Sequence, residues 1–530
     1  MPEIEQFDAV IIGGGINGCG TFRDLCLQGL KVLLLEREDF CAGASQASSR
    51  LMHGGLKYLE TGEFRLVRES LTERNMLLAT APHYVQPLEC LVPVRSTFGG
   101  ILGSAGRFLR LKTTLKDRGF LITALGLTLY DIYGRTLQAM PGHQMLTRGA
   151  LRRQFPRLSR RLTGAGVYFE AHVTHAERLG LELVLDGEAA SPGSQALNHA
   201  DVLGAEAGVI RFSHGGAHRA VRARSIVNAG GAWIDKVNAS LGLPTRLMGG
   251  SKGSHLVLRH PELLAALRGR MIYFGTPDGR VNLVYPFADH VLVGATDIAH
   301  PDPDSATCDA HEAAYLCRAV AEVFPDLPVT PAHVVARFCG TRPLPRAEGP
   351  IGQVSRDHSL AELKMPGSET PVHCLIGGKW TTFRAFAELA ADRVLGDLGH
   401  ARRVRTHGLP IGGGRGFPRD SATRAQVLAD LAQAAGVDQA RAAVLLSRYG
   451  MRAFGFAEAL SAGPERMLAG LPDYSAQELS HIAATERVAS LDDLLRRRTL
   501  IALQGRDTPA VRSELAALLP RLALEQRHIA

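Results

Sequence analysis

The glycine-rich stretch near the start of the chain constrains the fold more than any other feature. Residues 10–20 read VIIGGGINGCG, an apolar run followed by closely spaced glycines. Gly13, Gly15 and Gly18 have the spacing G-x-G-x-x-G. In a dinucleotide-binding turn, the first glycine permits a tight turn and the second lets the backbone approach a pyrophosphate. The third lets a helix pack closely on a strand.

The segments around these glycines complete the pattern. We expect a strand over residues 7–12, a helix over 19–28 and a second apolar strand over 31–36, which ends at Glu36. A carboxylate at this position accepts hydrogen bonds from ribose hydroxyls, and the N-terminus of the helix faces the anion. The sequence therefore predicts a β-α-β unit that binds a dinucleotide, and the pattern does not separate NAD from FAD.

Two later apolar runs also end in glycine, at residues 225–231 (SIVNAGG) and 373–378 (HCLIGG). Ligands of open α/β sheets bind beyond the carboxyl ends of the strands. These runs predict that one cofactor meets strand ends far apart in the sequence. The residues between them are then expected to form a second layer over the cofactor.

Candidate substrate-binding side chains lie beside glycines in several polar motifs. The motifs are SQASSR (45–50), HGGLKYLE (53–60), KGSH (252–255), GATD (294–297), GTRP (340–343) and GGKWTT (377–382). They contribute the cations Lys57, Arg342 and Lys379, and His255 as a candidate acid–base group. Fixed cations suit an anionic substrate, and a neutral imidazole can accept a proton near pH 7.

The composition limits the class of protein. The chain has 530 residues, enough for two or three domains, and its hydrophobic and charged fractions of 45% and 21% are those of a globular enzyme. Its eight cysteines show no C-x-x-C pair and no zinc or iron–sulfur spacing, so we expect neither a metal site nor a disulfide framework. The net charge of +8 favours an acidic partner. Nucleic acid is not expected, because no basic stripe is interleaved with aromatic residues.

One apolar segment raises the question of a membrane. Residues 119–130 (GFLITALGLTLY) are almost wholly apolar but fall short of the roughly 18 residues that a transmembrane helix needs. Basic residues are frequent just before them, over residues 107–118. This arrangement is typical of a helix that inserts into one leaflet and equally of a buried helix with a basic flank. The residues alone leave both readings open.

The chain changes character near residue 409. Residues 410–416 (PIGGGRG) predict a linker, and beyond residue 421 Ala, Leu, Arg and Glu recur at helical spacing. We therefore expect a helical C-terminal domain. Its arginines at 496–498 are expected on a solvated face, with a second membrane or subunit contact as the alternative.

Taken together, the motifs resemble those of FAD-dependent glycerol-3-phosphate dehydrogenases. GGGINGCG, SSRLMHGGLKYLETGEFRLVRESLTER, KGSH, GATD, GTRPL and GGKWTTFR occur in the order found in that family, over about residues 7–400. A weaker match continues through residues 448–450 and 486–499. The resemblance is to the single-subunit bacterial respiratory type, and it implies FAD as the cofactor.

The resemblance also implies the architecture. We expect an α/β fold with a Rossmann-like FAD-binding domain of the glutathione-reductase type, an interleaved antiparallel-sheet substrate (cap) domain, and a C-terminal all-α domain. The expected boundaries are about 7–90, 150–240 and 335–400 for the FAD-binding domain, about 90–150 and 240–335 for the cap domain, 401–420 for a linker and 421–530 for the helical domain.

Members of the family oxidise the C2 alcohol of sn-glycerol 3-phosphate to dihydroxyacetone phosphate, with transfer of a hydride to the flavin. By resemblance, Arg342 with Lys57, Tyr58 and Thr296 binds the substrate, and His255 is the base. The expected cofactor contacts are Gly13, Gly15, Gly18, Glu36, Ser45, Ser49, Ala229, Gly230, Gly377, Gly378 and Lys379. Arg342 and Lys379 are also expected to have catalytic roles. Many members carry Arg where this chain has Lys57, so that contact lacks a bidentate fork.

The resemblance further implies partners and a location. We expect membrane quinone as the electron acceptor, contact of residues 107–133 with anionic lipid, and a peripheral position on the cytoplasmic face of the inner membrane. We also expect a homodimer. Two alternatives remain open: a soluble glycerol-3-phosphate oxidase that reduces O₂, and a flavoenzyme of the glycine-oxidase or 2-hydroxy-acid-oxidase type.

Overall fold

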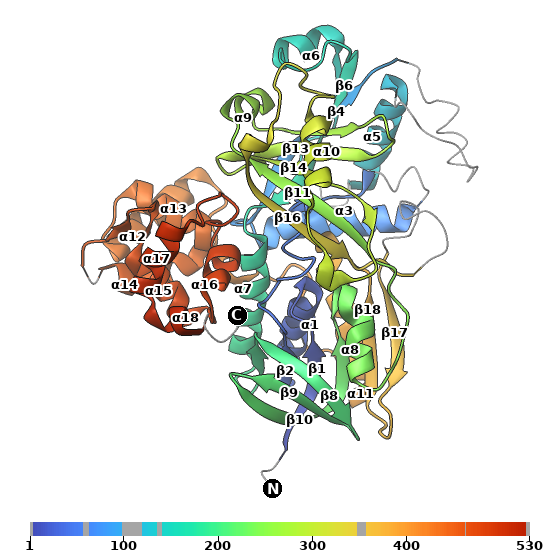
Figure 1. Ribbon diagram of the computed structural model, residues 1–530, viewed down its shortest axis with the longest axis vertical. Helices are drawn as coiled ribbons and strands as arrows, with labels where there is room; N and C mark the ends of the chain where they lie inside the picture. Colours follow the sequence, from blue (N-terminus) through green and yellow to red (C-terminus); the bar gives the residue numbers. More distant parts are fainter. Residues whose placement is uncertain are drawn as a thin grey trace.

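The computed structural model describes residues 4–56, 63–97, 119–134, 140–346, 357–461 and 463–525. Within them the chain forms an 8-stranded sheet, a 10-stranded sheet and a mainly helical C-terminal region. In Figure 1 the 10-stranded sheet lies above the 8-stranded one, and the C-terminal region lies at the side of both, next to helix α7. The expected combination of an α/β cofactor domain, a second sheet and C-terminal helices is therefore confirmed.

The 8-stranded sheet contains the glycine-ended strands predicted from the sequence. β1 lies parallel to both β2 and β10, and β10 lies parallel to β18, so the glycines that follow them meet at one edge. The order is β17 (Ser359–Lys364), β18 (Pro371–Ile376), β10 (Ala217–Asn228), β1 (Glu5–Ile12), β2 (Val32–Leu35) and β7 (Gln195–Leu197), with β9 (Val209–His214) and β8 (Ala200–Glu206) continuing from β10.

Both faces of this sheet are covered, which explains why its central strands are apolar throughout. Alternate residues of β1 enter two different cores: Ala9 and Ile11 join one cluster, whereas Val10 and Ile12 join another. The first core is closed by α1 (Ile16–Leu27), α7 (Ala176–Ala190) and α11 (Phe383–Leu398). The second core is closed by α8 (Ile234–Ser240) together with β8 and β9.

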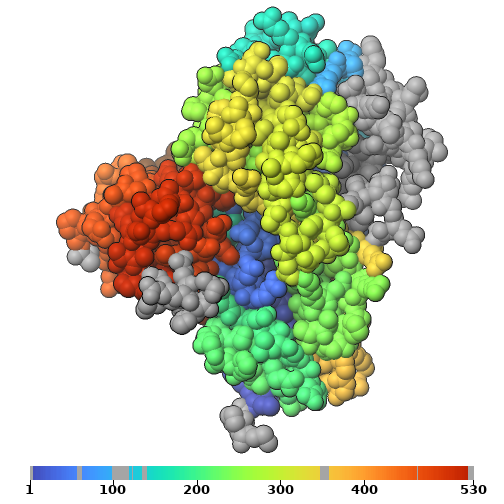
Figure 2. All heavy atoms as spheres, viewed as in Figure 1, coloured from blue at the N-terminus to red at the C-terminus, as the bar shows by residue number. Residues whose placement is uncertain are grey.

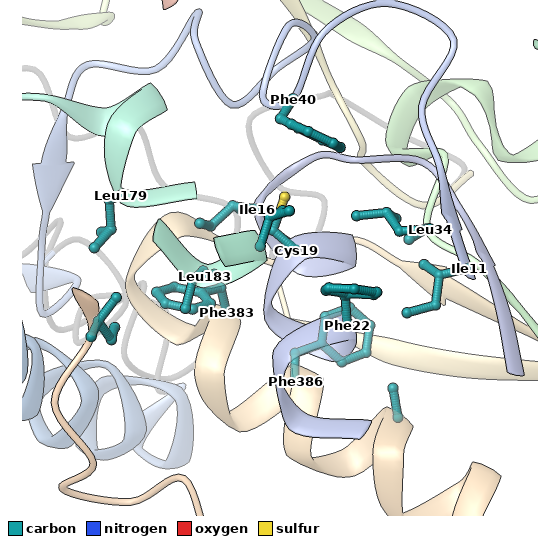
Figure 3. Close-up of a cluster of buried hydrophobic side chains, with 14 of the residues drawn as sticks. Ile11, Ile16, Cys19, Phe22, Leu34, Phe40, Leu179, Leu183, Phe383 and Phe386 are labelled. Carbon is teal, nitrogen blue, oxygen red and sulfur yellow. The ribbon is translucent and has the colours of Figure 1, made fainter. Parts of the chain in front are cut away.

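The core beside α1 holds the β-α-β unit in place. Figure 3 shows side chains from α1, the loop after β2, α7 and α11 gathered around Cys19 and Phe22. Phe22, Phe383 and Phe386 are almost fully buried there. Complete burial of a side chain of this size contributes about 1.5–3 kcal/mol, so the apolar packing sets where the N-terminus of α1 points.

The 10-stranded sheet is mostly antiparallel. Its strands are β3 (Leu51–Met52), β4 (Val85–Val94), β5 (Gln144–Thr147), β6 (Gly164–Val173), β11 (Ser251–Leu258), β12 (Met271–Gly275), β13 (Val281–Phe287), β14 (His290–Gly294), β15 (Ile298–Ala299) and β16 (Val334–Arg342). Its helices are α3 (Phe64–Thr80), α5 (Phe120–Gly134), α6 (Arg148–Gln154), α9 (Pro261–Leu267) and α10 (Ala310–Val320).

The membership of three strands differs from the expected boundaries. β3, β6 and β16 belong to the 10-stranded sheet, although residues 7–90, 150–240 and 335–400 were assigned to the cofactor-binding domain. β6 pairs with β4 along its whole length and with β3, and β16 pairs with β11. A local apolar pattern identifies a strand but not its neighbour, so the sequence could not assign these strands to a sheet.

Helix α5 presents apolar side chains on two sides. Leu127 and Tyr130 are buried against the rest of the protein, whereas Leu121, Leu125 and Ile132 are 48%, 62% and 50% exposed. The N-terminal part of the expected lipid contact, residues 107–118, lies outside the described residues. Among the helices of the described ranges, none combines the length and the apolar character needed to cross a bilayer.

The C-terminal region has its own core and a small hairpin. Its helices are α12 (Ser421–Ala435), α13 (Gln439–Tyr449), α14 (Ala457–Ser461), α15 (Ala476–Thr485), α16 (Leu491–Asp493), α17 (Pro509–Leu518) and α18 (Pro520–Glu525), and the hairpin consists of β19 (Met467–Leu468) and β20 (Leu471–Ser475). Side chains of Asp420, Asp438, Ser475 and Thr508 cap the starts of α12, α13, α15 and α17, each satisfying a backbone N–H that the helix leaves unpaired.

Two expectations for this part of the chain are corrected. The segment expected to be a linker is packed against α7: Gly413 N–H donates to Glu182 at 3.0 Å, and Ile411 is buried. The arginines expected in solvent are mostly internal, because Arg497 and Arg498 are buried in ion pairs with Asp39. Helical periodicity could not reveal Glu182 and Asp39 as partners, because both residues are far from these segments in the sequence.

Candidate active site

A large cavity of about 770 Å³ is lined by residues of both sheets. Its volume lies within the range usual for small-molecule and cofactor sites. The glycine-ended turns after β1, β10 and β18 line one part of it, and β11, β13 and β16 line another. In Figure 2 the blue N-terminal residues are visible in a recess between the red C-terminal region and the yellow-green strands.

The turn from β1 into α1 has the form that the glycine pattern predicts. Gly13 and Gly15 line the cavity, and Ile16 N–H at the start of α1 donates to Ser45 Oγ at 3.0 Å. Gly18 does not line the cavity. A Cβ on Gly18 would lie 1.9 Å from the Gly13 carbonyl oxygen, so its role is the close helix–strand packing that the fingerprint requires.

Glu36 lies at the end of β2 and lines the cavity. Its carboxylate accepts hydrogen bonds from Gly14 N–H at 2.5 Å and from Glu38 N–H at 2.8 Å. Burial raises the pKa of Glu36, and the two backbone donors act against that rise. Arg37 and Trp233, which the sequence did not single out, line the same end, with the Arg37 guanidinium 5.5 Å from the Trp233 ring.

His255 projects from β11 into the other end of the cavity. Its Nε2 lies 2.7 Å from Ser49 Oγ, and its ring stacks on Phe338 with 5.0 Å between ring centres. Burial, with a smaller effect of the positive charges of Arg342 and Arg50, lowers the pKa of His255 to about 3. The imidazole is therefore neutral near pH 7 and able to accept a proton.

Arg342 is fixed at the end of β16 by a set of acceptors. Its Nη1 donates to Asp297 Oδ1 at 2.9 Å, and its Nη2 donates to the Thr296 carbonyl at 2.8 Å. A Cβ on Gly253 would lie 2.1 Å from Nη2, so only glycine leaves room for the guanidinium. A planar group held in this way presents one orientation to a ligand.

The remaining predicted residues divide into two groups. Ala229, Gly230, Gly377, Gly378 and Lys379 all line the cavity, and Lys379 Nζ donates to Ser70 Oγ at 2.8 Å. Lys57 and Tyr58 lie outside the described residues.

Thr296 lines the cavity, but its hydroxyl is held by partners within the protein. Its hydroxyl donates to Glu312 at 2.6 Å and accepts from Ser254 N–H at 2.9 Å, so it points into the protein. Thr296 therefore meets the cavity through its backbone, whose carbonyl holds Arg342. Glu312 also pairs with Lys252 at 2.6 Å, which makes this network a support for the Arg342 side of the cavity.

Sequence reasoning missed Glu170 on β6. Its buried carboxylate lines the cavity and accepts hydrogen bonds from Gly54 N–H, Arg74 and Tyr130 at 2.9, 3.0 and 2.7 Å. Burial raises the pKa of Glu170, while Arg74 acts in the opposite direction. Arg74 is the last residue of the long motif at 48–74, but Glu170 lies on a different element and in no motif, so no local signal pointed to this pair.

The residues of the cavity fit FAD. Two glycines and the N-terminus of α1 open onto one end beside the Glu36 carboxylate, which suits a pyrophosphate and a ribose. Gly377 and Gly378, both with positive φ, expose backbone further along the same cavity. The cavity continues from there to His255 and Arg342, leaving space for a ring system and a substrate.

The fold and the cavity thus define an FAD-dependent oxidoreductase. Residues 8–393 match the family described as FAD dependent oxidoreductase, and residues 404–522 match the C-terminal domain of alpha-glycerophosphate oxidase. The chain belongs to this family, and within it to the group of the FAD-dependent glycerol-3-phosphate dehydrogenases.

Individual relatives support this placement. The chain is 34% identical to a glycerol-3-phosphate dehydrogenase of Synechocystis, over 96% of this chain and 91% of the relative. It is 32% identical to a D-erythritol 1-phosphate dehydrogenase of Brucella abortus, over 94% of this chain and 95% of the relative. Its fold is similar to that of a glycerol-3-phosphate dehydrogenase from Bacillus halodurans complexed with FAD, with a TM-score of 0.73 and 23% identity over 99% of this chain and 94% of that one.

The environment of His255 predicts an acid-sensitive contribution to stability. Its folded-state pKa is about 3, whereas an unfolded histidine has a pKa of about 6.5. Between these values the unfolded chain binds more protons, so this contribution is present above pH 6.5 and is lost as the pH falls toward 3. We expect His255→Asn to reduce the pH dependence of the unfolding free energy in this window by up to about 1.4 kcal/mol per pH unit.

Urea unfolding of the two proteins at several pH values from 7 to 4 measures this difference. His311→Asn, a change at an exposed side chain on α10, is the control for loss of an imidazole. If the unfolding free energy of His255→Asn depends on pH as steeply as that of the wild type, the imidazole is hydrated or charged in the folded protein.

Proposed function

We propose that the protein oxidises sn-glycerol 3-phosphate to dihydroxyacetone phosphate. The observation that carries the proposal is the placement of a fixed guanidinium, Arg342, and a neutral imidazole, His255, on neighbouring strands of the cavity that fits FAD. The relatives described above, which are named as dehydrogenases of polyol phosphates, support the same substrate class.

Binding of the substrate phosphate is assigned to the Arg342 side. Asp297 and the Thr296 carbonyl hold the guanidinium in one orientation, which suits the planar, bidentate contacts that phosphate makes with arginine. Arg342 and Lys379 both line the cavity and bring fixed positive charges to it. A phosphate dianion is attracted to these charges, whereas an uncharged polyol is not.

His255 is assigned the role of base for the C2 hydroxyl. FAD, when bound, supplies the hydride acceptor. Ser49 Oγ, 2.7 Å from Nε2, orients the imidazole, and Phe338 fixes the plane of its ring. Burial is the main cause of the lowered pKa of His255, and Arg342 is the second. A phosphate dianion at Arg342 offsets this second cause, so substrate binding makes the imidazole a stronger base. Lys379, held by Ser70, adds positive charge beside Gly377 and Gly378.

Anaerobic mixing tests the substrate assignment directly. We expect sn-glycerol 3-phosphate to bleach the visible absorbance of the bound flavin, and glycerol, glycine, lactate and 2-hydroxyglutarate to leave it unchanged. D-erythritol 1-phosphate belongs in the same series, because a relative is named for it. Bleaching by glycine or a 2-hydroxy acid but not by either phosphate would favour the amino-acid or hydroxy-acid oxidase alternative.

A substitution of His255 tests its role as base. His255→Asn should retain FAD and slow flavin reduction by the substrate ~10²-fold or more, which is the usual contribution of a general base. Stopped-flow absorbance under anaerobic conditions measures the rate, and His311→Asn is again the control. Reduction at the wild-type rate would remove His255 from this role.

We further propose that the electrons pass to membrane quinone and that the protein acts at the cytoplasmic face of the inner membrane. The exposed Leu121, Leu125 and Ile132 of α5 support contact with a lipid surface. The buried side of the same helix contacts the cavity wall, because Tyr130 donates to Glu170. Transfer to O₂ is the alternative, and reoxidation of the reduced flavin by a short-chain quinone or by air distinguishes the two acceptors.

A charge on α5 tests the lipid contact. Leu125→Asp should reduce cosedimentation with phosphatidylglycerol-containing vesicles, because insertion would then require burial of a carboxylate. The matched control is Leu203→Asp on β8, a leucine that is 49% exposed on the other sheet. Equal vesicle binding by the two variants would contradict the assignment of α5, provided that both retain FAD.

A further inference from the structure

The C-terminal region contacts the cofactor-binding part of the protein through a buried ion pair. Arg498 Nη1 lies 2.6 Å from Asp39 Oδ2, and its Nη2 lies 2.9 Å from Asp39 Oδ1. Asp39 is fully buried and Arg498 is 1% exposed. Two parallel charge-assisted hydrogen bonds of this kind fix both the distance and the orientation of the partners.

Asp39 lies in the loop that follows Glu36, and this loop forms the wall of one end of the cavity. The residues on both sides of Asp39, at 36–38 and 42–45, line the cavity, whereas Asp39 itself does not. Cys41 N–H donates to the Gly14 carbonyl at 2.9 Å. A Cβ on Gly14 would lie 2.9 Å from the Phe40 ring. The loop therefore packs against the glycine turn. Arg498 holds it through Asp39, which does not line the cavity.

Arg498 is itself held in place by residues around it. Its Nε donates to the Glu486 carbonyl at 2.8 Å, and its own carbonyl accepts from Arg178 of α7 at 3.1 Å. Arg178 also forms two hydrogen bonds with the Glu486 carboxylate, at 2.7 and 2.8 Å. Because these partners fix Arg498, its guanidinium cannot move together with the loop. A displacement of the loop therefore breaks the contact between Arg498 and Asp39.

Two further contacts join the same parts of the molecule. His199 Nε2 lies 3.0 Å from Asp493, and His199 directly precedes residues 200–202, which line the cavity. Arg497 lies 3.7 Å from Glu38, another lining residue. Residues 493–498 therefore contact the Glu36 end of the cavity wall from the outside at several points.

We propose that the C-terminal region retains the cofactor: Arg498 positions loop 36–45 around the adenosine half of FAD. In the dinucleotide fingerprint, the acid at the end of the second strand meets the adenosine ribose, and this acid is Glu36. Arg498 and Asp39 are positioning residues, because neither lines the cavity. Docking of the C-terminal region and binding of FAD are then coupled, and each strengthens the other by the same factor.

Removal of Arg498 tests this coupling. In Arg498→Met the buried Asp39 carboxylate loses its two hydrogen bonds to a guanidinium and keeps Asn198 at 2.9 Å and the more distant Arg497 at 3.6 Å. A buried charge with weaker compensation is unfavourable, so the loop should shift until that carboxylate reaches water. We expect the dissociation constant for FAD to rise about 5- to 150-fold, the usual range for coupling between two sites. Flavin fluorescence after dilution of the holoenzyme measures the release, and Asp39→Asn breaks the same pair from the loop side.

A second measurement separates this role from a general loss of stability. Hydrogen exchange of the FAD-loaded variant should show loss of protection in residues 36–45, while flavin reduction by the substrate remains at the wild-type rate, since His255 and Arg342 are unchanged. Arg487→Gln is the matched control: it breaks the Arg487–Glu188 pair of 2.6 Å between the same parts of the molecule but leaves the loop untouched.

Two results would overturn the proposal. FAD affinity in Arg498→Met could equal that in Arg487→Gln, or protection of residues 36–45 could stay as in the wild type. If Arg498→Met does not fold, the same criteria apply to Asp39→Asn. Weaker FAD binding with a loosened loop in either variant, and not in the control, supports it.

Discussion

The close approach of α1 to β1 is the constraint on which the rest of the structure depends. Gly18 lies so near the Gly13 carbonyl that no side chain fits between them, and this contact points the N-terminus of α1 into the cavity. The apolar core around Phe22 packs against α1 and holds the helix in that position. Because β10 and β18 run parallel to β1, their terminal glycines arrive at the same edge, and the cavity follows from this alignment.

Much of this could be predicted from the sequence because the signals are local. Spacing within a few residues identified the turn at Gly13, the acid Glu36 and the glycines at 230 and 377, and all of them reach the cavity. His255 and Arg342 were recognised from motifs and also line it. Such residues are found from sequence because backbone geometry near a ligand restricts the residue type at each position.

The contacts that support these residues could not be predicted in this way. Asp39 and Arg498 are 459 positions apart, and an arginine in a helical segment is ordinarily a surface charge. Glu170 pairs with Arg74 across two elements, and the Thr296 hydroxyl serves Glu312 instead of the cavity. The residues next to a side chain in the sequence do not specify a partner so distant in the chain. For the same reason β6 and β16 were assigned to the cofactor-binding domain, although they pair in the 10-stranded sheet.

The supporting contacts also explain how a base can work beside a cation. Burial lowers the pKa of His255 most, and Arg342, which attracts an anionic substrate, lowers it as well, so both weaken the imidazole as a proton acceptor. A bound dianion opposes the part of this effect that comes from the guanidinium, whereas the effect of burial remains. An uncharged alcohol in the same cavity would meet a weak base. The charge of a phosphorylated substrate therefore favours proton transfer to His255 as well as binding.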